Sequence, residues 1–249
     1  MKQIIKKHWK RITFLFFGLA ISYLFLLTFP SVFFAYKIEY KQCTVYSDKP
    51  IDDNITVIID DAIGRISKSE LYDSTIHFNF FICNDIWRLS LFTQGNTNAG
   101  AVTQYDFTRN IFFRPCDIVE NKIIPAESWY FKNDSLAFID RPLIYYFAHE
   151  MTHVLQSQYT GRGHWRYPTW LTEGYADYIA KDGEFDFNKN LTLWHDKAPE
   201  LDPTKGLYRL YHLKIAYLLD RQNKTIKEIY EHTPTDKILT EVLWAIRHN

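Results

Sequence analysis

The spacing of apolar residues predicts strands in the first half of the chain. Residues 52–68 are the exception, because their isoleucines recur at helical intervals and predict one helix. The run from Ser74 to Asn84 is rich in β-branched and aromatic residues, which is typical of a strand. Segments 98–106 and 109–115 predict two more strands on either side of a turn.

From Asp140 onwards the apolar pattern becomes helical. Asp140 is a plausible N-cap, and the helix it opens should end at Gly161. A second helix is predicted to start after Thr169 and to end near Gly183. Two or three further helices are predicted over residues 205–220 and 224–247. Strands followed by helices indicate an α+β fold, with a small mixed β-sheet subdomain followed by a helical subdomain.

Residues 12–36 carry no charged side chain. The run is 25 residues long, and about 20 suffice to cross a bilayer. Residues 1–11 hold five lysines and arginines and no acid, a pattern typical of a segment that stays in the cytoplasm. The sequence therefore predicts a cytoplasmic basic tail (1–11), a transmembrane signal anchor (12–36) and an extracytoplasmic domain (37–249).

The apolar run has two alternative interpretations, a cleaved signal peptide and a buried core helix. A cleaved signal peptide has an apolar core of about 7–15 residues and a small-x-small cleavage site. Here the apolar run is longer, no convincing site follows it, and Gly18-Leu19-Ala20 comes too early. A buried core helix would rarely be charge-free for so long beside such a basic flank.

The whole chain has a formal net charge of zero, but its charged residues are distributed unevenly. The 29 basic and 29 acidic residues cancel, so residues 37–249 carry a net charge of −5 once the basic tail is set aside. An acidic body lacks the electrostatic footprint of a nucleic-acid-binding protein. No nucleic-acid partner is therefore expected.

The chain has three cysteines, Cys43, Cys83 and Cys116, and none of them forms a CxxC pair. A thiolate zinc site is therefore not expected. A disulfide between Cys83 and Cys116 is one interpretation. The other is that the cysteines are small buried hydrophobic residues.

The stretch FAHEMTHVLQ, Phe147 to Gln156, contains the motif HExxH. Residues four apart lie on one face of a helix, so His149 and His153 can converge on one metal ion. Glu150 can face the same cavity without binding the metal, as a general base requires. The helix has a separate apolar stripe for its core contacts, formed by Leu143, Phe147, Met151 and Val154. The alternative is a pair of core histidines with satisfied hydrogen bonds.

A third ligand is needed for a zinc site. The metzincin continuation is excluded, because Gln156 and Tyr159 stand where a glycine and a histidine would be required. Glu173 lies on the next predicted helix and would complete a His₂Glu set, which leaves a fourth position for water as in catalytic zinc sites. Asp177, one turn later, could accept the other ring N–H of a zinc histidine. The alternatives are an acid favoured by the helix dipole and a solvent-exposed aspartate.

HExxH followed after about twenty residues by Glu in WLTEGYADY, Trp170 to Tyr178, resembles the gluzincin metallopeptidases of the thermolysin-like clan. More narrowly, it is similar to the peptidase MA-like domains of bacterial envelope proteins. The motifs cover roughly residues 140–220. The resemblance implies that Glu173 is the third zinc ligand and that Asp177 is an acid that supports the ligands.

The same resemblance implies a donor for the oxyanion of the transition state. Tyr208 takes the matching place in YRLYHLKIAYLLD, but the Lys-Gly pair of the family is absent, and Tyr211 and His212 remain competitors. GAVTQ, Gly100 to Gln104, resembles the substrate-binding edge strand of aminopeptidase N-like enzymes. Thr103 replaces the acid that holds a free amino group there, which favours an endopeptidase.

The sequence thus predicts a membrane-anchored zinc-dependent hydrolase, an endopeptidase acting on a peptide or protein substrate, with one Zn²⁺ per chain. Zinc would activate water, Glu150 would take its proton, and Tyr208 would stabilise the oxyanion. The substrate would lie along an edge strand within residues 100–114. One alternative is a catalytically quiet zinc-binding domain that binds a partner. Another is a structural protein whose histidine pair is incidental.

Overall fold

The computed structural model describes residues 2–105, 108–124, 141–202 and 208–246. Its centre is a five-stranded mixed sheet in the order β1-β2-β3-β5-β4. The inner pairs β2–β3 and β3–β5 are parallel, and the outer pairs β1–β2 and β4–β5 are antiparallel. The strands are β1 (Tyr36–Tyr40), β2 (Cys43–Ser47), β3 (Phe78–Ile82), β4 (Ala101–Thr103) and β5 (Ile111–Phe113). The predicted α+β class and mixed sheet agree with this architecture.

Alternation along the strands gives the sheet two apolar faces. Phe80 and Ile82 point into the main core with α2 (Ile55–Ile66) and α5 (Leu143–Thr160). Phe81 and Cys83 point to the opposite face, where they form a second cluster with residues of α3 (Ile86–Phe92). A sheet buried on both faces explains why its strands are nearly continuous apolar runs.

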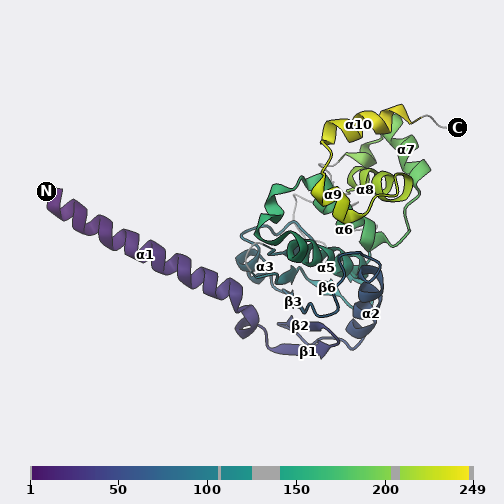
Figure 1. Ribbon diagram of the computed structural model, residues 1–249. Coiled ribbons are helices and arrows are strands. Elements are labelled where there is room, and N and C mark those ends of the chain that lie inside the picture. The colour runs from purple at the N-terminus through teal and green to yellow at the C-terminus, as the bar shows by residue number, and fades with distance from the viewer. Residues whose placement is uncertain (1, 106–107, 125–140, 203–207, 247–249) are drawn as a thin grey trace.

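Helices make up the second half of the chain, as predicted, and those that follow α5 gather at one end of the body (Figure 1). The helix α5 ends at Gly161, whose φ of 64° a glycine adopts without a steric penalty. The predicted cap Asp140 lies outside the described residues. Thr169 is the first residue of its helix rather than the cap. The helices are α6 (Thr169–Lys181), α7 (Phe187–His195), α8 (Arg209–Ala216), α9 (Ile226–Glu231) and α10 (Asp236–Ala245).

Short elements connect these helices and strands. A two-stranded ribbon of β6 (Cys116–Asp117) and β7 (Lys122–Ile123) precedes α5. One π-helical turn, Tyr217–Arg221, follows α8. The 3₁₀ turns are Pro30–Phe33, Gly161–Arg166 and Pro199–Leu201.

The predicted transmembrane anchor, residues 12–36, is wrong. The helix α1 (Lys2–Thr28) ends inside the run, a 3₁₀ turn follows at Pro30–Phe33, and Tyr36 already begins β1. Only the 17 residues Ile12–Thr28 of the charge-free run are helical, fewer than the about 20 that a span requires. In the described part of the chain, no helix combines the length and the apolar character needed to cross a membrane. The same finding contradicts the predicted topology of a single-pass membrane protein with a cytoplasmic N-terminus.

The end of the apolar run belongs to the core of the body. Leu27 and Phe34 are buried in the second cluster, against Phe81 and Phe92. The hydroxyl of Tyr23 donates to the carbonyl of Leu91 at 2.7 Å. The N-terminal part of α1 projects away from the body (Figure 1). Part of the apolar run is thus explained by packing against the sheet.

The predicted disulfide between Cys83 and Cys116 is also wrong, since all three cysteines are free. Cys43 and Cys83 are fully buried in different clusters, and burial raises the pKa of the Cys43 thiol to about 12. These two cysteines behave as small buried hydrophobic residues.

Candidate metal centre

The helix α5 carries both histidines through the middle of the molecule. Residues 143–157 are buried on every side, because α5 packs against α2 and β4 on one side and against α6 on the other. The predicted apolar stripe of Leu143, Phe147, Met151 and Val154 lies in the main core. The histidines therefore need not serve core packing and are left to face α6.

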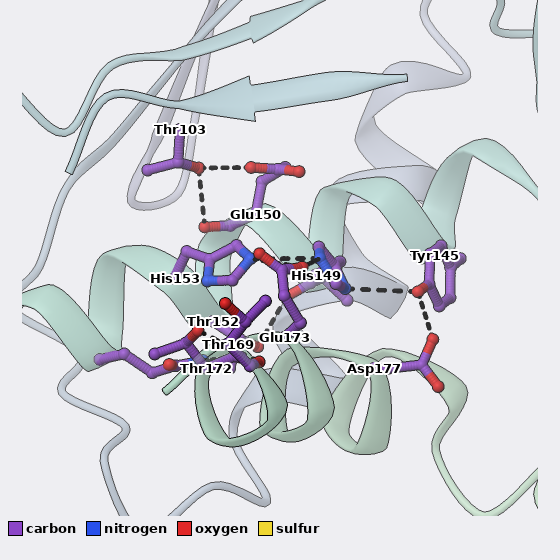
Figure 2. Close-up of polar contacts among 12 residues, drawn as sticks. Thr103, Tyr145, His149, Glu150, Thr152, His153, Thr169, Thr172, Glu173 and Asp177 are labelled. Carbon is purple, nitrogen blue, oxygen red and sulfur yellow. Dashed lines mark hydrogen bonds and ion pairs between the residues drawn. The ribbon is translucent and has the colours of Figure 1, made fainter. Parts of the chain in front are cut away.

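Three predicted ligands converge between α5 and α6 (Figure 2). The Nε2 atoms of His149 and His153 are 3.2 Å apart. Oε2 of Glu173 lies 3.2 Å from Nε2 of His149 and 3.5 Å from Nε2 of His153. Four-residue spacing on α5 aligns the two rings, and α6 packs beside α5 and brings the carboxylate to them.

The spacing of these donor atoms fits zinc. In a tetrahedral site with Zn–N distances of about 2.0–2.1 Å, neighbouring donor atoms are about 3.3 Å apart. The three edges of the triangle here are 3.2, 3.2 and 3.5 Å. Two imidazoles and one carboxylate are also a donor set that catalytic zinc sites use.

The carboxylate of Glu173 is held in its ionised form. Burial alone would raise its pKa, but the neighbouring His153 and His149 hold the pKa of Glu173 well below its ordinary range. The ring of His153 is affected in the opposite sense. Burial lowers its pKa, but the charge of Glu173 outweighs burial and raises the pKa of His153. The acid is thus in the state in which it can bind a metal.

The outer nitrogen of His149 is connected to Asp177 through Tyr145 (Figure 2). The hydroxyl of Tyr145 donates to Oδ1 of Asp177 at 2.5 Å. Nδ1 of His149 is 3.3 Å from the same hydroxyl oxygen, and it must donate because the phenol proton is already used. This arrangement leaves the Nε2 lone pair of His149 facing Glu173 and His153.

Asp177 was predicted to accept the ring N–H directly, but Tyr145 stands between them. Asp177 is fully buried and also binds Nζ of Lys181 at 2.7 Å and Nδ1 of His212 at 2.9 Å. Burial would raise its pKa, but Lys181 and His212 hold the pKa of Asp177 well below its ordinary range. The position of Tyr145, four residues before His149, was the one signal of this link in the sequence.

Glu150, the predicted base, lies beside the histidines and faces β4 (Figure 2). The hydroxyl of Thr103 donates to Oε2 of Glu150 at 2.6 Å. Both side chains are buried. The resemblance implied only that Thr103 stands where aminopeptidase N-like enzymes have an acid. The structure brings Thr103 into contact with Glu150, where it orients the carboxylate.

Tyr208 lies next to the ligands. Its ring stacks on that of His149 with centroids 5.8 Å apart. Burial and the charge of Glu173 raise the pKa of Tyr208, so the phenol keeps its proton and can donate. Tyr208 has a φ of 53°, which is unusual for a bulky residue.

The competitors of Tyr208 have other contacts. Nδ1 of His212 is bonded to Asp177, and the backbone of Tyr211 packs at Gly174. A Cβ on Gly174 would lie 2.6 Å from the carbonyl oxygen of Tyr211, so a glycine beside Glu173 lets α8 approach α6 closely. That approach brings Tyr208, at the start of α8, to the ligands.

His164, in the 3₁₀ turn Gly161–Arg166, is buried near the site. Its ring lies 6.5 Å from that of His153, and its Nδ1 is 3.3 Å from the hydroxyl of Thr160. Burial, with a smaller contribution from His153, lowers the pKa of His164 to about 4. A neutral ring therefore covers this side of the site at neutral pH.

The chain gives no match in comparisons with protein-family models, with curated proteins or with solved structures. The resemblance to the gluzincins therefore rests on the motif residues of α5 and α6. The zinc ligands, the base and the oxyanion donor that it implies stay predictions.

Proposed function

We propose that the protein is a zinc-dependent hydrolase of the HExxH/Glu type, with an endopeptidase activity. The observation that carries the proposal is the triangle of donor atoms from His149, His153 and Glu173, with Glu150 beside it. Zinc in such a site supplies Lewis acidity, which polarises a carbonyl group and makes water more acidic.

The side chains of the site have separate roles in this proposal. Glu150 takes a proton from the attacking water and passes it to the leaving amine. The hydrogen bond from Thr103 holds the Glu150 carboxylate in place while one of its oxygens remains available. Tyr208 donates a hydrogen bond to the oxygen that becomes negatively charged.

The substrate backbone would pair with β4. This strand is at the edge of the sheet, whereas β5 lies between β3 and β4 and offers no free edge. Of the predicted substrate-binding segment, residues 100–114, only the part around Ala101–Thr103 therefore has a free edge with which a substrate could pair. A peptide added there would run past Glu150, because Thr103 at the end of β4 contacts it.

Metal analysis tests the site. The full chain should retain one zinc ion after purification, and Glu173→Ala should lower the zinc content and the zinc affinity. Glu231→Ala, which removes an exposed glutamate of α9, is the matched control and should keep the metal. Equal zinc affinity in Glu173→Ala and the control would contradict the ligand assignment.

A cleavage assay with a library of quenched fluorescent peptides tests the activity. Glu150→Gln should keep the metal and lower kcat by about 10²–10⁴, the usual contribution of a general base. A zinc-loaded chain that cleaves no peptide would instead support the quiet binding domain. Unchanged cleavage in Glu150→Gln would exclude Glu150 as the base.

A further inference from the structure

A cavity of about 410 Å³ opens beside Tyr145, the residue that links His149 to Asp177. It lies between the start of α5, the end of α6, the helix α7 and the start of α8. Among the described residues that line it, five are basic and two, Glu184 and Asp186, are acidic. The basic residues are Arg65, Arg141, Lys181, Lys189 and Arg209.

Three of these cations are close enough to influence one another. Burial lowers the pKa of Lys181, and the charges of Arg141 and Arg209 lower it further, against the opposing effect of Asp177. Asp177 lies 2.7 Å from Lys181 and 3.7 Å from Arg141, so one buried carboxylate faces two cations. An anion that entered the cavity would be attracted to all of these charges.

The acids of the lining offset this charge only in part. The carboxylate of Asp186 accepts the backbone N–H of Lys189 at 2.9 Å and caps α7. Glu184 is exposed. The ammonium of Lys189 is exposed, and within the described ranges it forms no ion pair. Lys189 is therefore available to an incoming ligand.

The cavity also has apolar walls. Pro142, Phe185 and Leu193 line it together with the ring of Tyr145. The guanidinium of Arg141 lies over that ring, 4.8 Å from its centroid. Arginines bind the planar oxygens of carboxylates and phosphates through paired N–H donors, and a lysine adds a point charge.

We propose that this cavity is a binding site for a small anion, whose carboxylate or phosphate group is held by Arg141, Lys181, Lys189 and Arg209. The apolar walls leave room for an organic part of the ligand. The site is separate from the metal ligands and does not require that the protein hydrolyse anything. Its tests therefore use binding, not activity.

Isothermal titration of the full chain with inorganic phosphate and with succinate tests the proposal. At least one of the two should bind saturably with one site per chain. Binding of phosphate alone identifies a phosphoryl ligand, and binding of succinate alone identifies a carboxylate. The affinity should fall between about 0.05 M and 0.5 M salt, because the attraction is electrostatic. Binding of neither anion would overturn the proposal.

Charge reversal of one residue locates the site. Lys189→Glu should weaken binding at least about tenfold, the effect of losing one charge-assisted hydrogen bond. Lys189 is the third residue of α7, where an acid favours the helix dipole, so the variant should fold. Lys227→Glu in the first turn of α9 is the matched control, because Lys227 is exposed and does not line the cavity. Equal loss in both variants would overturn the proposal.

One further control separates the cavity from the metal centre. The titrations are repeated on the full chain after its metal has been removed by a chelator and the chelator dialysed away. Binding that persists and still depends on Lys189 supports the cavity. Binding that disappears with the metal would show that the anion binds the metal and would overturn the proposal.

Discussion

The surroundings of the two histidines that are predicted to bind the metal differ. Nδ1 of His149 is held by Tyr145, and Tyr145 is held by the buried Asp177. Nδ1 of His153 is buried as well, but no described residue hydrogen-bonds it. The outer nitrogen of His149 is thus held by a chain of hydrogen bonds that reaches α6 and α8, whereas the outer nitrogen of His153 has no such support among the described residues. Orientation of the ligands should therefore depend mainly on the His149 side.

Among the substitutions on the His149 side of the site, replacing Asp177 should have the largest effect. Asp177→Asn keeps the shape of the side chain but leaves the half-buried Lys181 and the buried Arg141 without its charge. We expect the free energy of unfolding to fall by about 3–5 kcal/mol, as when one partner of a buried ion pair is removed. Urea denaturation measures this change.

An exposed ion pair provides the control for Asp177→Asn. Asp60 lies 2.6 Å from Lys41 on the surface, and Asp60→Asn should cost no more than about 1 kcal/mol. A loss in Asp177→Asn that is no larger than this would mean that the buried network does not stabilise the fold.

A substitution at Gly174 tests whether the His149 side of the site requires the close packing of α8 on α6. A Cβ at Gly174 would push against the backbone of Tyr211, so Gly174→Ala should destabilise the protein by about 1–3 kcal/mol. The same change at Gly64, a helical position with open space, should stabilise it by about 0.5–1 kcal/mol. Thermal unfolding of both variants checks the opposite signs. A neutral Gly174→Ala would show that α8 can move away from α6 freely.

Tyr145→Phe removes the hydroxyl that connects His149 to Asp177 and changes little else. Loss of such a supporting hydrogen bond typically weakens metal affinity about 10–100-fold. Competition with a chromophoric chelator measures the zinc affinity. Tyr178→Phe is the matched control, since its hydroxyl bonds Asp220 at 2.7 Å and reaches no metal ligand. Equal zinc affinity in both variants would show that the link through Tyr145 does not orient His149.

Substitutions on the His153 side of the site should change the zinc affinity least. His164 packs near His153 without a hydrogen bond to it, so His164→Gln should change zinc affinity by less than about threefold. Circular dichroism of the variant checks that the fold is retained. A loss as large as that in Tyr145→Phe would mean that the two sides are equally important, and it would overturn the comparison.

Local sequence patterns predicted which side chains converge between α5 and α6. The spacing of His149 and His153 follows from helical geometry, which depends on residues four apart. Glu173 could be predicted because only a short connection joins its helix to the first. The prediction that the apolar run near the N-terminus is a membrane anchor was wrong, because the surroundings of that run depend on contacts with distant parts of the chain. A sequence does not distinguish apolar residues that enter a protein core from apolar residues that have other surroundings. Only the packing shows that Leu27 and Phe34 contact the sheet.

The sequence alone determined the α+β order of elements, the pair of histidines on one helical face and the candidate acid on the next helix. Tertiary structure decided the rest. It brought Thr103 to Glu150 and Tyr145 to Asp177, and it gathered basic residues from α2, α6, α7, α8 and the segment before α5 around one cavity. The physical reason is range. Helix and strand periodicity is set by neighbours along the chain, whereas these contacts join residues far apart in sequence that only the packing of the elements makes adjacent.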